Sequence, residues 1–477
     1  VMALLNLSSL SLPLSDGFAT KIPNHRIVQD GQYVLYTIQV NIDPYSWTVE
    51  RRYSDFEQYD KLRFPDRSKS FLPKKKVTGN LERDFIEERK IELDKYLRSV
   101  IELEIWYQRD RQLHSLPLLL AQFLDMHQYE VHAIVDDLSI RLGKVGEAWI
   151  KGSETQPKYF EFTPIELHSV GERMRLAEPS TIGRADASHV VEFMHNVRSL
   201  RVRGTRGFVG TSSIVCSTLS INLSFCKALL ALWLIDCDVC RLSCHSHLRS
   251  HLRTLVVHYS MESCKDVLSG DSMDGEEFLP WSALEDVDFS FNTVSQLDES
   301  LSLLPNVKTF VMTHNQLTEI GRCLIDLHSL TELDLSHNNI EEVDRWNEKL
   351  GNLKILILAG NRIRDLEGIS KLYSLQLLDV SKNKLATVDS VSPIGRLPCL
   401  EELLLEGNGI AEMAEYRTRV LEAFTDRATE ITLDGRMADA RERNTIGVRL
   451  ALRRAEMEKK RREMMRDEEQ LRYLGGE

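Results

Sequence analysis

The sequence lacks any run of 18 apolar residues, so it predicts no membrane-spanning helix. Its eight cysteines among 477 residues are scattered without regular spacing, which favours a reducing cytosolic setting over a disulfide-bonded secreted fold. Phosphate-binding glycine loops, the G-x-S-x-G elbow, the H-E-x-x-H helix and the kinase signature are all missing. We therefore expect neither an enzyme nor a protein with a cofactor.

Positive charge is also scarce, with 60 Lys+Arg against 72 Asp+Glu and a net charge of −12, which argues against nucleic acid as a partner. Residues 1–127 carry 18 charges of each sign, so residues 128–477 hold the whole excess of acid. A neutral first domain with a local cationic pocket can approach an anionic membrane, whereas the acidic remainder would be repelled from it.

Three motifs follow one another within residues 51–97. The first, RRYSDF, places a planar fork of donors at Arg52, which suits a phosphate, beside the ring of Tyr53. The second is the proline-stiffened LPKKK, and the third is a helix opened by Arg89. The apolar side of this helix is predicted to hold Ile91, Leu93, Tyr96 and Leu97.

Strands over 33–40 and 47–52 and helices over 55–64, 82–105 and 116–127 are predicted around these motifs. The ordered set resembles the PX (phox homology) domain over residues 20–127. The resemblance implies that phosphatidylinositol 3-phosphate binds here: the second arginine of the first motif takes the 3-phosphate, the tyrosine packs on the inositol, and the helix arginine binds the 4- and 5-hydroxyls. A loop lysine would meet the 1-phosphate, although a solvated loop charge is the alternative for each of the three lysines. The implied lipid-binding residues are Arg52, Tyr53, Lys75 or Lys76, and Arg89.

From residue 281 the pattern LxxLxLxxN recurs every 22 to 25 residues, as in leucine-rich repeats. Each copy predicts one short strand with inward leucines, for example Leu335 and Leu358, and an asparagine that satisfies backbone groups inside the coil. No coil buries its own apolar face, so the coils must stack. The six asparagines are Asn292, Asn315, Asn338, Asn361, Asn383 and Asn408. Weaker copies ending at Thr205, Cys237 and Ser260 extend the solenoid toward residue 190.

The predicted fold is multidomain α+β: a PX domain with a small antiparallel sheet and helices, then a leucine-rich-repeat solenoid and a charged C-terminal helix. The predicted parts are a disordered lead (1–19), the PX domain (20–127), a connector and N-terminal cap (128–189), the solenoid with its C-terminal cap (190–435) and a helical tail (436–477). Within the connector we expect a helix over 130–143 followed by mixed strand and loop. An acidic insertion, Ser269–Phe278, interrupts the solenoid.

The tail repeats an apolar residue every seven positions, from Leu450 through Met457 and Met464 to Leu471. The second heptad position, which a coiled coil also needs to be apolar, is mostly charged. This pattern favours a single exposed helix over a dimerising one, and a weak homo-oligomer is left open. Near residue 240, CDVCRLSCHSH has metal-ligand residue types, but Cys237 fills a repeat asparagine position and Cys240 is expected to pack in the return segment. We therefore predict no metal site.

Outward strand positions in the repeats combine carboxylates with aliphatic side chains. They predict either a solvated acidic surface or a docking face for a basic, partly apolar protein segment. The residues of the docking face would be Asp288, Asp334, Ile357, Asp379, Glu402 and Leu404.

A PX domain followed directly by leucine-rich repeats is similar to the nischarin (imidazoline-receptor-candidate) family, as are HQYEVHAI, KLGNLKILILAGN and YRTRVLEAF. The resemblance implies a cytoplasmic scaffold, peripheral on early or recycling endosomes, that regulates signalling and cell migration. Its implied partners are membranes with phosphatidylinositol 3-phosphate, Rac-pathway kinases, small GTPases and integrin tails. The short repeats and their cap also resemble the regulatory subunit of protein phosphatase 1, with the PX domain then serving as a membrane tether.

Overall fold

A computed structural model describes most of the chain. It covers residues 18–28, 33–42, 45–66, 70–75, 81–111, 117–150, 159–175, 188–204, 219–243, 245–269 and 279–474. The chain forms two compact units, Val1–Leu229 with Asp236–Cys244 and Leu230–Ile235 with His245–Glu477. Among the described residues, no helix is both long and apolar enough to cross a membrane.

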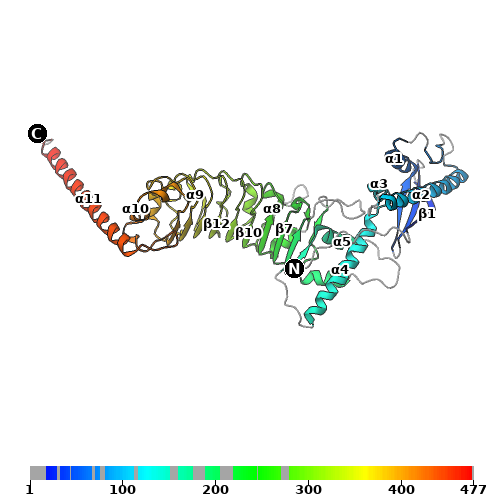
Figure 1. The fold of residues 1–477 in the computed structure, drawn as a ribbon, viewed down its shortest axis with the longest axis horizontal. Helices are drawn as coiled ribbons and strands as arrows, with labels where there is room; N and C mark the ends of the chain where they lie inside the picture. Colours follow the sequence, from blue (N-terminus) through cyan, green and yellow to red (C-terminus); the bar gives the residue numbers. More distant parts are fainter. Residues whose placement is uncertain are drawn as a thin grey trace. The chain divides into compact units, whose positions relative to one another are not determined.

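The first unit begins with three antiparallel strands packed against helices (Figure 1). Strict alternation of buried and half-buried residues along the middle strand turns Tyr36, Ile38 and Val40 toward the helices. The elements are β1 (Ala19–Ile27), β2 (Val34–Ile42), β3 (Tyr45–Arg52), α1 (Tyr53–Arg63), α2 (Arg83–Arg111) and α3 (Leu118–Phe123). They confirm the predicted strands and helices.

Helix α2 turns Leu93, Tyr96 and Leu97 into the core, as predicted, but Ile91 is 53% exposed. The prediction for Ile91 was wrong because Ile91 lies two positions before the buried Leu93, and residues with that spacing point to different sides of a helix. The inward stripe continues instead at Val100 and Ile101.

The connector contains α4 (His127–Ile150), β4 (Phe160–Phe162), α5 (Pro164–Arg175) and α6 (Ser188–Asn196). The expected helix over 130–143 is confirmed and is longer than predicted, and β4 confirms a strand after it, but α5 was not predicted. A capping box explains α5: the Thr163 amide donates to the Glu166 carboxylate at 2.6 Å, and the Glu166 amide approaches the Thr163 hydroxyl at 3.4 Å. The first weak repeat forms β5 (Ser199–Arg203), which pairs in parallel with β4.

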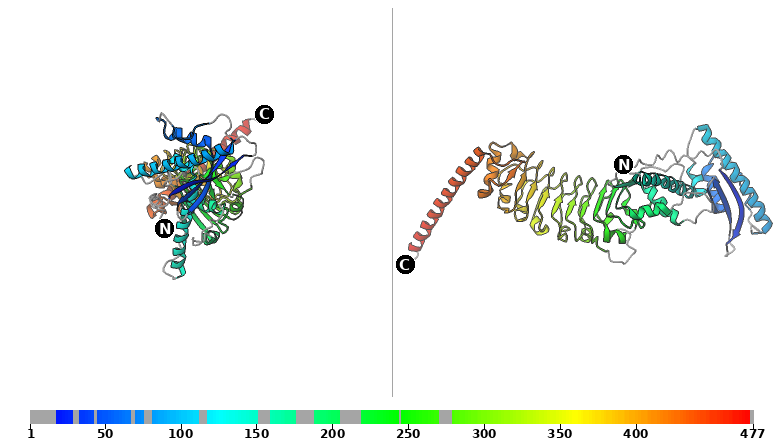
Figure 2. Two further views of the ribbon diagram at one scale, coloured as in Figure 1. Left: turned by 90° about the vertical axis from the view of Figure 1, so that its right-hand side faces the viewer. Right: turned by 90° about the horizontal axis from the view of Figure 1, so that it is seen from below.

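The second unit is the solenoid, whose successive coils are coloured green to orange in Figure 2. Each coil adds one short parallel strand in register with the last. The strands are β7 (Ala231–Ile235), β9 (Thr254–His258), β10 (Asp286–Asp288), β11 (Thr309–Val311), β12 (Glu332–Asp334), β13 (Ile355–Ile357), β14 (Leu377–Asp379), β15 (Glu402–Leu404) and β16 (Thr432–Leu433). Leu335 and Leu358 are fully buried, as predicted, but each lies one residue beyond its strand.

Short helices connect the coils. They are α7 (His245–His251), α8 (Lys265–Leu268), α9 (Trp346–Lys349) and α10 (Tyr416–Glu422). The 3₁₀ turns are Val239–Arg241, Glu299–Leu303, Glu367–Ile369, Ser392–Arg396, Gly409–Glu412 and Thr425–Arg427. Two further strands, β6 (Ile221–Asn222) and β8 (Leu242–Ser243), pair with each other.

The predicted asparagine ladder is confirmed. The Asn338 amide nitrogen donates to the carbonyls of Met312 and Leu335, both at 2.9 Å, while its oxygen accepts the Leu317 amide at 3.0 Å. Asn338 therefore satisfies buried backbone groups of its own coil and of the preceding one. The other five asparagines of the set are buried in the same way.

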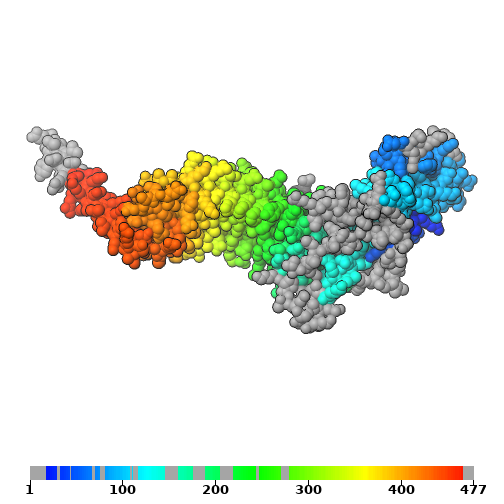
Figure 3. Space-filling model, in the orientation of Figure 1, coloured from blue at the N-terminus to red at the C-terminus, as the bar shows by residue number. Residues whose placement is uncertain are grey.

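The C-terminal cap buries Val420, Leu421 and Phe424 and half-buries Tyr416. Asp434 ends the stack of strands: its carboxylate accepts the Leu405 amide at 2.7 Å, whereas the equivalent amides of Leu358 and Val380 donate to a carbonyl of the next strand. Helix α11 (Ala440–Leu474) follows, and the space-filling view shows it projecting from the solenoid (Figure 3).

Candidate functional site

The two arginines that end β3 point in different directions. Arg51 donates to the Asp125 carboxylate at 2.8 Å, which ties the strand to the end of α3. Arg52 is the residue before α1, and Asp55 accepts both its backbone amide at 2.9 Å and its Nε at 3.1 Å. The Arg52 side chain is 54% exposed, and its Nη groups have no hydrogen-bond partner among the described residues. Asp55 thus orients the guanidinium and leaves its outer donors available for an anion.

Tyr53 joins the start of α1 to the proline loop. Its hydroxyl donates to the Pro73 carbonyl at 2.6 Å. Burial raises the pKa of Tyr53, and the nearby Arg89 guanidinium opposes that rise. The phenol is therefore neutral at physiological pH and acts as a donor that fixes the loop.

Arg89 is the most unusual residue of the site. Only 7% of it is exposed, and its Nε and one Nη make no hydrogen bond among the described residues. Its guanidinium carbon lies 4.6 Å from the ring centroid of Tyr53 and 4.2 Å from that of Phe85. Two aromatic faces thus hold a buried cation that has no anionic partner within the described part of the chain, and such burial is costly unless a ligand supplies one.

Tyr36 lies beneath this arginine on β2. Burial raises the pKa of its hydroxyl, and the positive charge of Arg89 opposes the rise. The hydroxyl has no partner with hydrogen-bond geometry among the described residues, so we attribute the effect of Arg89 mainly to its charge. A second polar group is therefore left unsatisfied next to the buried guanidinium.

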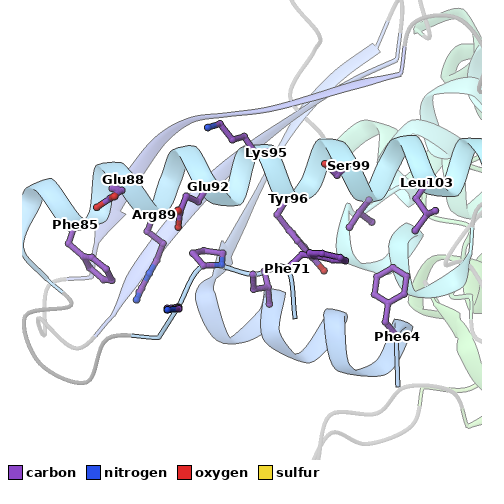
Figure 4. Close-up of a pocket in the computed structure, with 14 residues that line it drawn as sticks. Phe64, Phe71, Phe85, Glu88, Arg89, Glu92, Lys95, Tyr96, Ser99 and Leu103 are labelled. Atoms are coloured by element: carbon purple, nitrogen blue, oxygen red, sulfur yellow. The ribbon is translucent and has the colours of Figure 1, made fainter. Parts of the chain in front are cut away.

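A cavity of about 900 Å³ opens beside Arg89, between α2 and the proline loop (Figure 4). Phe85 and Arg89 extend from one side of α2, whereas Lys95 extends away from the loop. The lining carries charges of both signs near Arg89, where Glu88 and Glu92 accompany Lys74, and is apolar near Phe64. The volume is ample for an inositol phosphate, since ligand pockets commonly measure about 300–1,000 Å³.

The structure distinguishes between the loop lysines. Lys74 lines the cavity. Lys75 forms an ion pair with Glu57 at 3.1 Å, and hydrogen bonds from Lys75 and Lys61 lower the pKa of that carboxyl. Lys76 lies outside the described residues. The assignment of Lys75 or Lys76 to the 1-phosphate stays a prediction, and Lys74 joins them as a candidate.

Sequence reasoning missed the residues that support the arginines. Asp55 could have been found from the spacing of a capping box, whereas Phe85 has no local signal. Asp60, which is 6% exposed, accepts the Tyr96 hydroxyl at 2.7 Å and the Ser70 hydroxyl at 2.8 Å. This buried carboxylate fastens the proline loop to both helices.

The predicted docking face lies on one side of the solenoid sheet. Its third strand positions form a register row that alternates carboxylate and aliphatic residues. The row consists of Asp288, Val311, Asp334, Ile357, Asp379 and Leu404, each half-buried. Glu402 lies in the neighbouring row, whose other members include Asp286, Glu332, Ile355 and Leu377.

The aspartates of this row also have a structural role. Asp288, Asp334 and Asp379 each accept the backbone amide two residues on, at 2.9 Å, through one carboxylate oxygen. The second oxygen of Asp288 lies 3.1 Å from His258. Burial alone would raise the pKa of Asp288, but His258 and Ser290 outweigh it and the pKa is lowered.

The cysteine and histidine segment shows no metal cluster within the described part of the chain. Cys237 is buried, and its thiol lies 3.5 Å from the Val202 carbonyl, as an asparagine substitute should. Cys240 is exposed, so the expectation that it packs was wrong: in the 3₁₀ turn Val239–Arg241, Val239 takes the buried place. Cys244 lies outside the described residues.

Comparison with known protein families finds both the PX domain and the leucine-rich repeats. Residues 39–118 match the PX domain family, residues 272–340 match the leucine rich repeat family, and 328–371 and 351–393 match the family of two-copy repeats. Serine/threonine-protein kinase 11-interacting protein is 34% identical over 192 residues in Homo sapiens and 30% identical over 189 residues in Gallus gallus. Each match covers 39% of this chain and 18% of the relative.

Sorting nexin-20 of Rattus norvegicus is 36% identical over 85 residues, which is 17% of this chain and 27% of that protein. An internalin of Listeria monocytogenes superposes with a TM-score of 0.35 at 19% identity, over 52% of this chain and 69% of the internalin. The family matches show that the protein combines a PX domain with leucine-rich repeats, and the curated relatives match it over part of its length. These modules support a membrane-associated scaffold.

Proposed function

We propose that the PX domain binds phosphatidylinositol 3-phosphate. The observation that carries this proposal is the buried Arg89 guanidinium, which lies between two aromatic rings beside the cavity and has no anionic partner among the described residues. Arg52, oriented by Asp55, adds a second fork of donors. Arg89 lies over the ring of Tyr53, the residue that follows Arg52, and two such arginine forks suit a ligand with a phosphate and vicinal hydroxyls.

Liposome sedimentation of the intact chain tests this assignment. Arg52→Ala should remove most specific binding, because the phosphate loses a charge-assisted partner at a cost of roughly 1.5–3 kcal/mol. Arg52→Lys should fail as well, since a point charge lacks the fork. Arg98→Ala is the matched control, because Arg98, like Arg52, is about half exposed and paired with one acid, but it lies outside the three motifs. Unchanged binding by Arg52→Ala would refute the assignment.

We further propose that the solenoid recruits a protein segment that is both basic and apolar through its alternating row. Carboxylates at Asp334 and Asp379 would set the association rate and salt sensitivity, and Ile357 between them would supply apolar contact. A protein kinase is the partner class we favour, because two relatives are named for interaction with one. This fits the Rac-pathway kinases implied by the nischarin resemblance.

The resulting function is a nischarin-like, non-enzymatic scaffold that links an endosomal membrane to signalling proteins. Reversing Asp334 and Asp379 to lysine should abolish partner pull-down while endosomal targeting persists, because the lipid pocket is separate. Retention of every partner would place the recruiting surface elsewhere. Co-purification of phosphatase 1 without any need for lipid would instead favour the phosphatase-subunit alternative.

A further inference from the structure

The alternating row on the solenoid has a fixed period. Neighbouring strands of a sheet lie about 4.8 Å apart, so residues two strands apart in the row are separated by about 9.6 Å. Ile357, Asp379 and Leu404 occupy equivalent positions on β13, β14 and β15. We call this apolar–acidic–apolar set the strand triad.

Helix α11 carries the complementary pattern. Met457 and Met464 are seven residues apart, which is about 10.5 Å along a helix, and each is 66% exposed. Lys460 and Arg461 lie between them on the same face, within about 100° of arc. We call this apolar–basic–apolar set the helix triad.

The opposite face of the helix is different. Lys459 and Arg462 lie within 3.9 Å and 3.3 Å of Glu463 and Glu458, so charges on that side are balanced. Lys460 and Arg461 form no ion pair among the described residues. The triad side is therefore the uncompensated side of the helix, and it also carries exposed methionines, which often mark adaptable binding surfaces.

We propose that the helix triad of one copy docks on the strand triad of a second copy. The methionines would cover the two aliphatic strand residues, and the basic pair would meet the Asp379 carboxylate oxygen that does not accept the Ser381 amide. The periods differ by about 1 Å, which flexible methionine side chains can absorb. Each triad has an apolar residue at both ends and a charge between them, so the helix could dock in either direction along the row of strands.

The helix does not cover the face of its own chain. Its first turns are fastened to the C-terminal cap by Arg417 with Glu442 at 2.8 Å and by Arg453 with Glu422 at 3.0 Å. Every residue from 451 to 465 is exposed. The contact joins two different patches, so it is heterologous and either closes into a ring or continues head to tail.

This inference rests on the docking face proposed above and is independent of the lipid pocket. Sedimentation velocity of the intact chain at low salt, over a concentration series, tests it. Wild type should show a mass that rises with concentration. Lys460→Glu with Arg461→Glu should raise the dissociation constant roughly tenfold or more, because two attractions become repulsions.

The chain offers a matched control. Lys459→Glu with Arg462→Glu makes the same change in charge on the opposite face and should leave association unchanged. The decisive variant adds Asp379→Lys to the Lys460→Glu and Arg461→Glu pair, which should restore association by exchanging the signs. Asp379→Asn keeps an oxygen for the Ser381 amide, so it should weaken association without lowering the melting temperature.

A wild-type chain that stays monomeric at its highest soluble concentration would overturn the proposal. Association that persists after the charges of Lys460 and Arg461 are reversed would also overturn it. So would association that does not change when Asp379 is substituted, because it would then reflect pairing between helices. The helix variants leave the strand triad intact, so their pull-down of other proteins reports separately on the recruiting function.

Discussion

At the scale of single residues, Asn338 shows how one side chain connects two coils. Replacing it with alanine removes two donors and one acceptor from a buried site. We expect a loss of roughly 1–3 kcal/mol for each buried backbone group left without a partner. Thermal melting of Asn338→Ala should therefore fall well below that of the neighbouring control Asn339→Ala. Equal melting temperatures would contradict the ladder.

Asp298 provides a second residue-level prediction, on pH. Burial alone would raise its pKa, but hydrogen bonds from the Ser300 hydroxyl, from the Ser263 hydroxyl at 2.7 Å and from the Ser300 amide at 2.9 Å outweigh burial, so the folded pKa is lowered. This stability is present above the unfolded pKa of about 3.9 and is lost as pH falls through the folded value. Asp298→Asn should thus melt below wild type at neutral pH, and the gap should narrow on acidification. A gap that is constant with pH would refute the role.

At the scale of elements, the capping box at the start of α5 is predicted to stabilise that helix. Thr163→Ala should cost about 0.5–2 kcal/mol, because the first turn loses a side-chain acceptor. Thr163→Ser keeps the hydroxyl and should retain most of the stability. Urea melts of the two variants provide the measurement, and identical midpoints would show that the box does not hold the helix.

The same element shows where prediction from sequence stops. The strands of the repeats could be predicted because their leucines and asparagines recur with a fixed period. Helix α5 was missed, although T-P-I-E at 163–166 carries its start signal, because its apolar residues are few and its neighbours look irregular.

In the candidate lipid site, Arg52, Tyr53 and Arg89 could be predicted from the sequence because they belong to motifs. Phe85 and Asp60 depend on how α1, α2 and the proline loop meet, and no local pattern encodes that. The loop lysines are adjacent in sequence, so only the loop conformation decides which of them lines the cavity.

At the scale of the whole molecule, we predict that the solenoid responds as one cooperative unit. Leu358→Ala should cost roughly 2–5 kcal/mol, because a buried side chain is lost from a stack whose coils cannot fold alone. Hydrogen exchange should then quicken in coils on both sides, as far as β9 and β16. Faster exchange confined to β13 and its neighbours would show that the solenoid unfolds in parts.

The asparagine ladder also has a consequence for how such a chain can change in length. The side chains of Asn315, Asn338 and Asn361 bind the preceding coil with the same spacing. Each side-chain oxygen accepts a backbone amide 21 residues earlier, and each side-chain nitrogen donates to a carbonyl 26 residues earlier. Removing or duplicating one 23-residue coil therefore recreates the same bonds at the new junction. The number of repeats can therefore change by whole coils, with Asp434 closing the last one, and each change lengthens or shortens the proposed docking face by one strand.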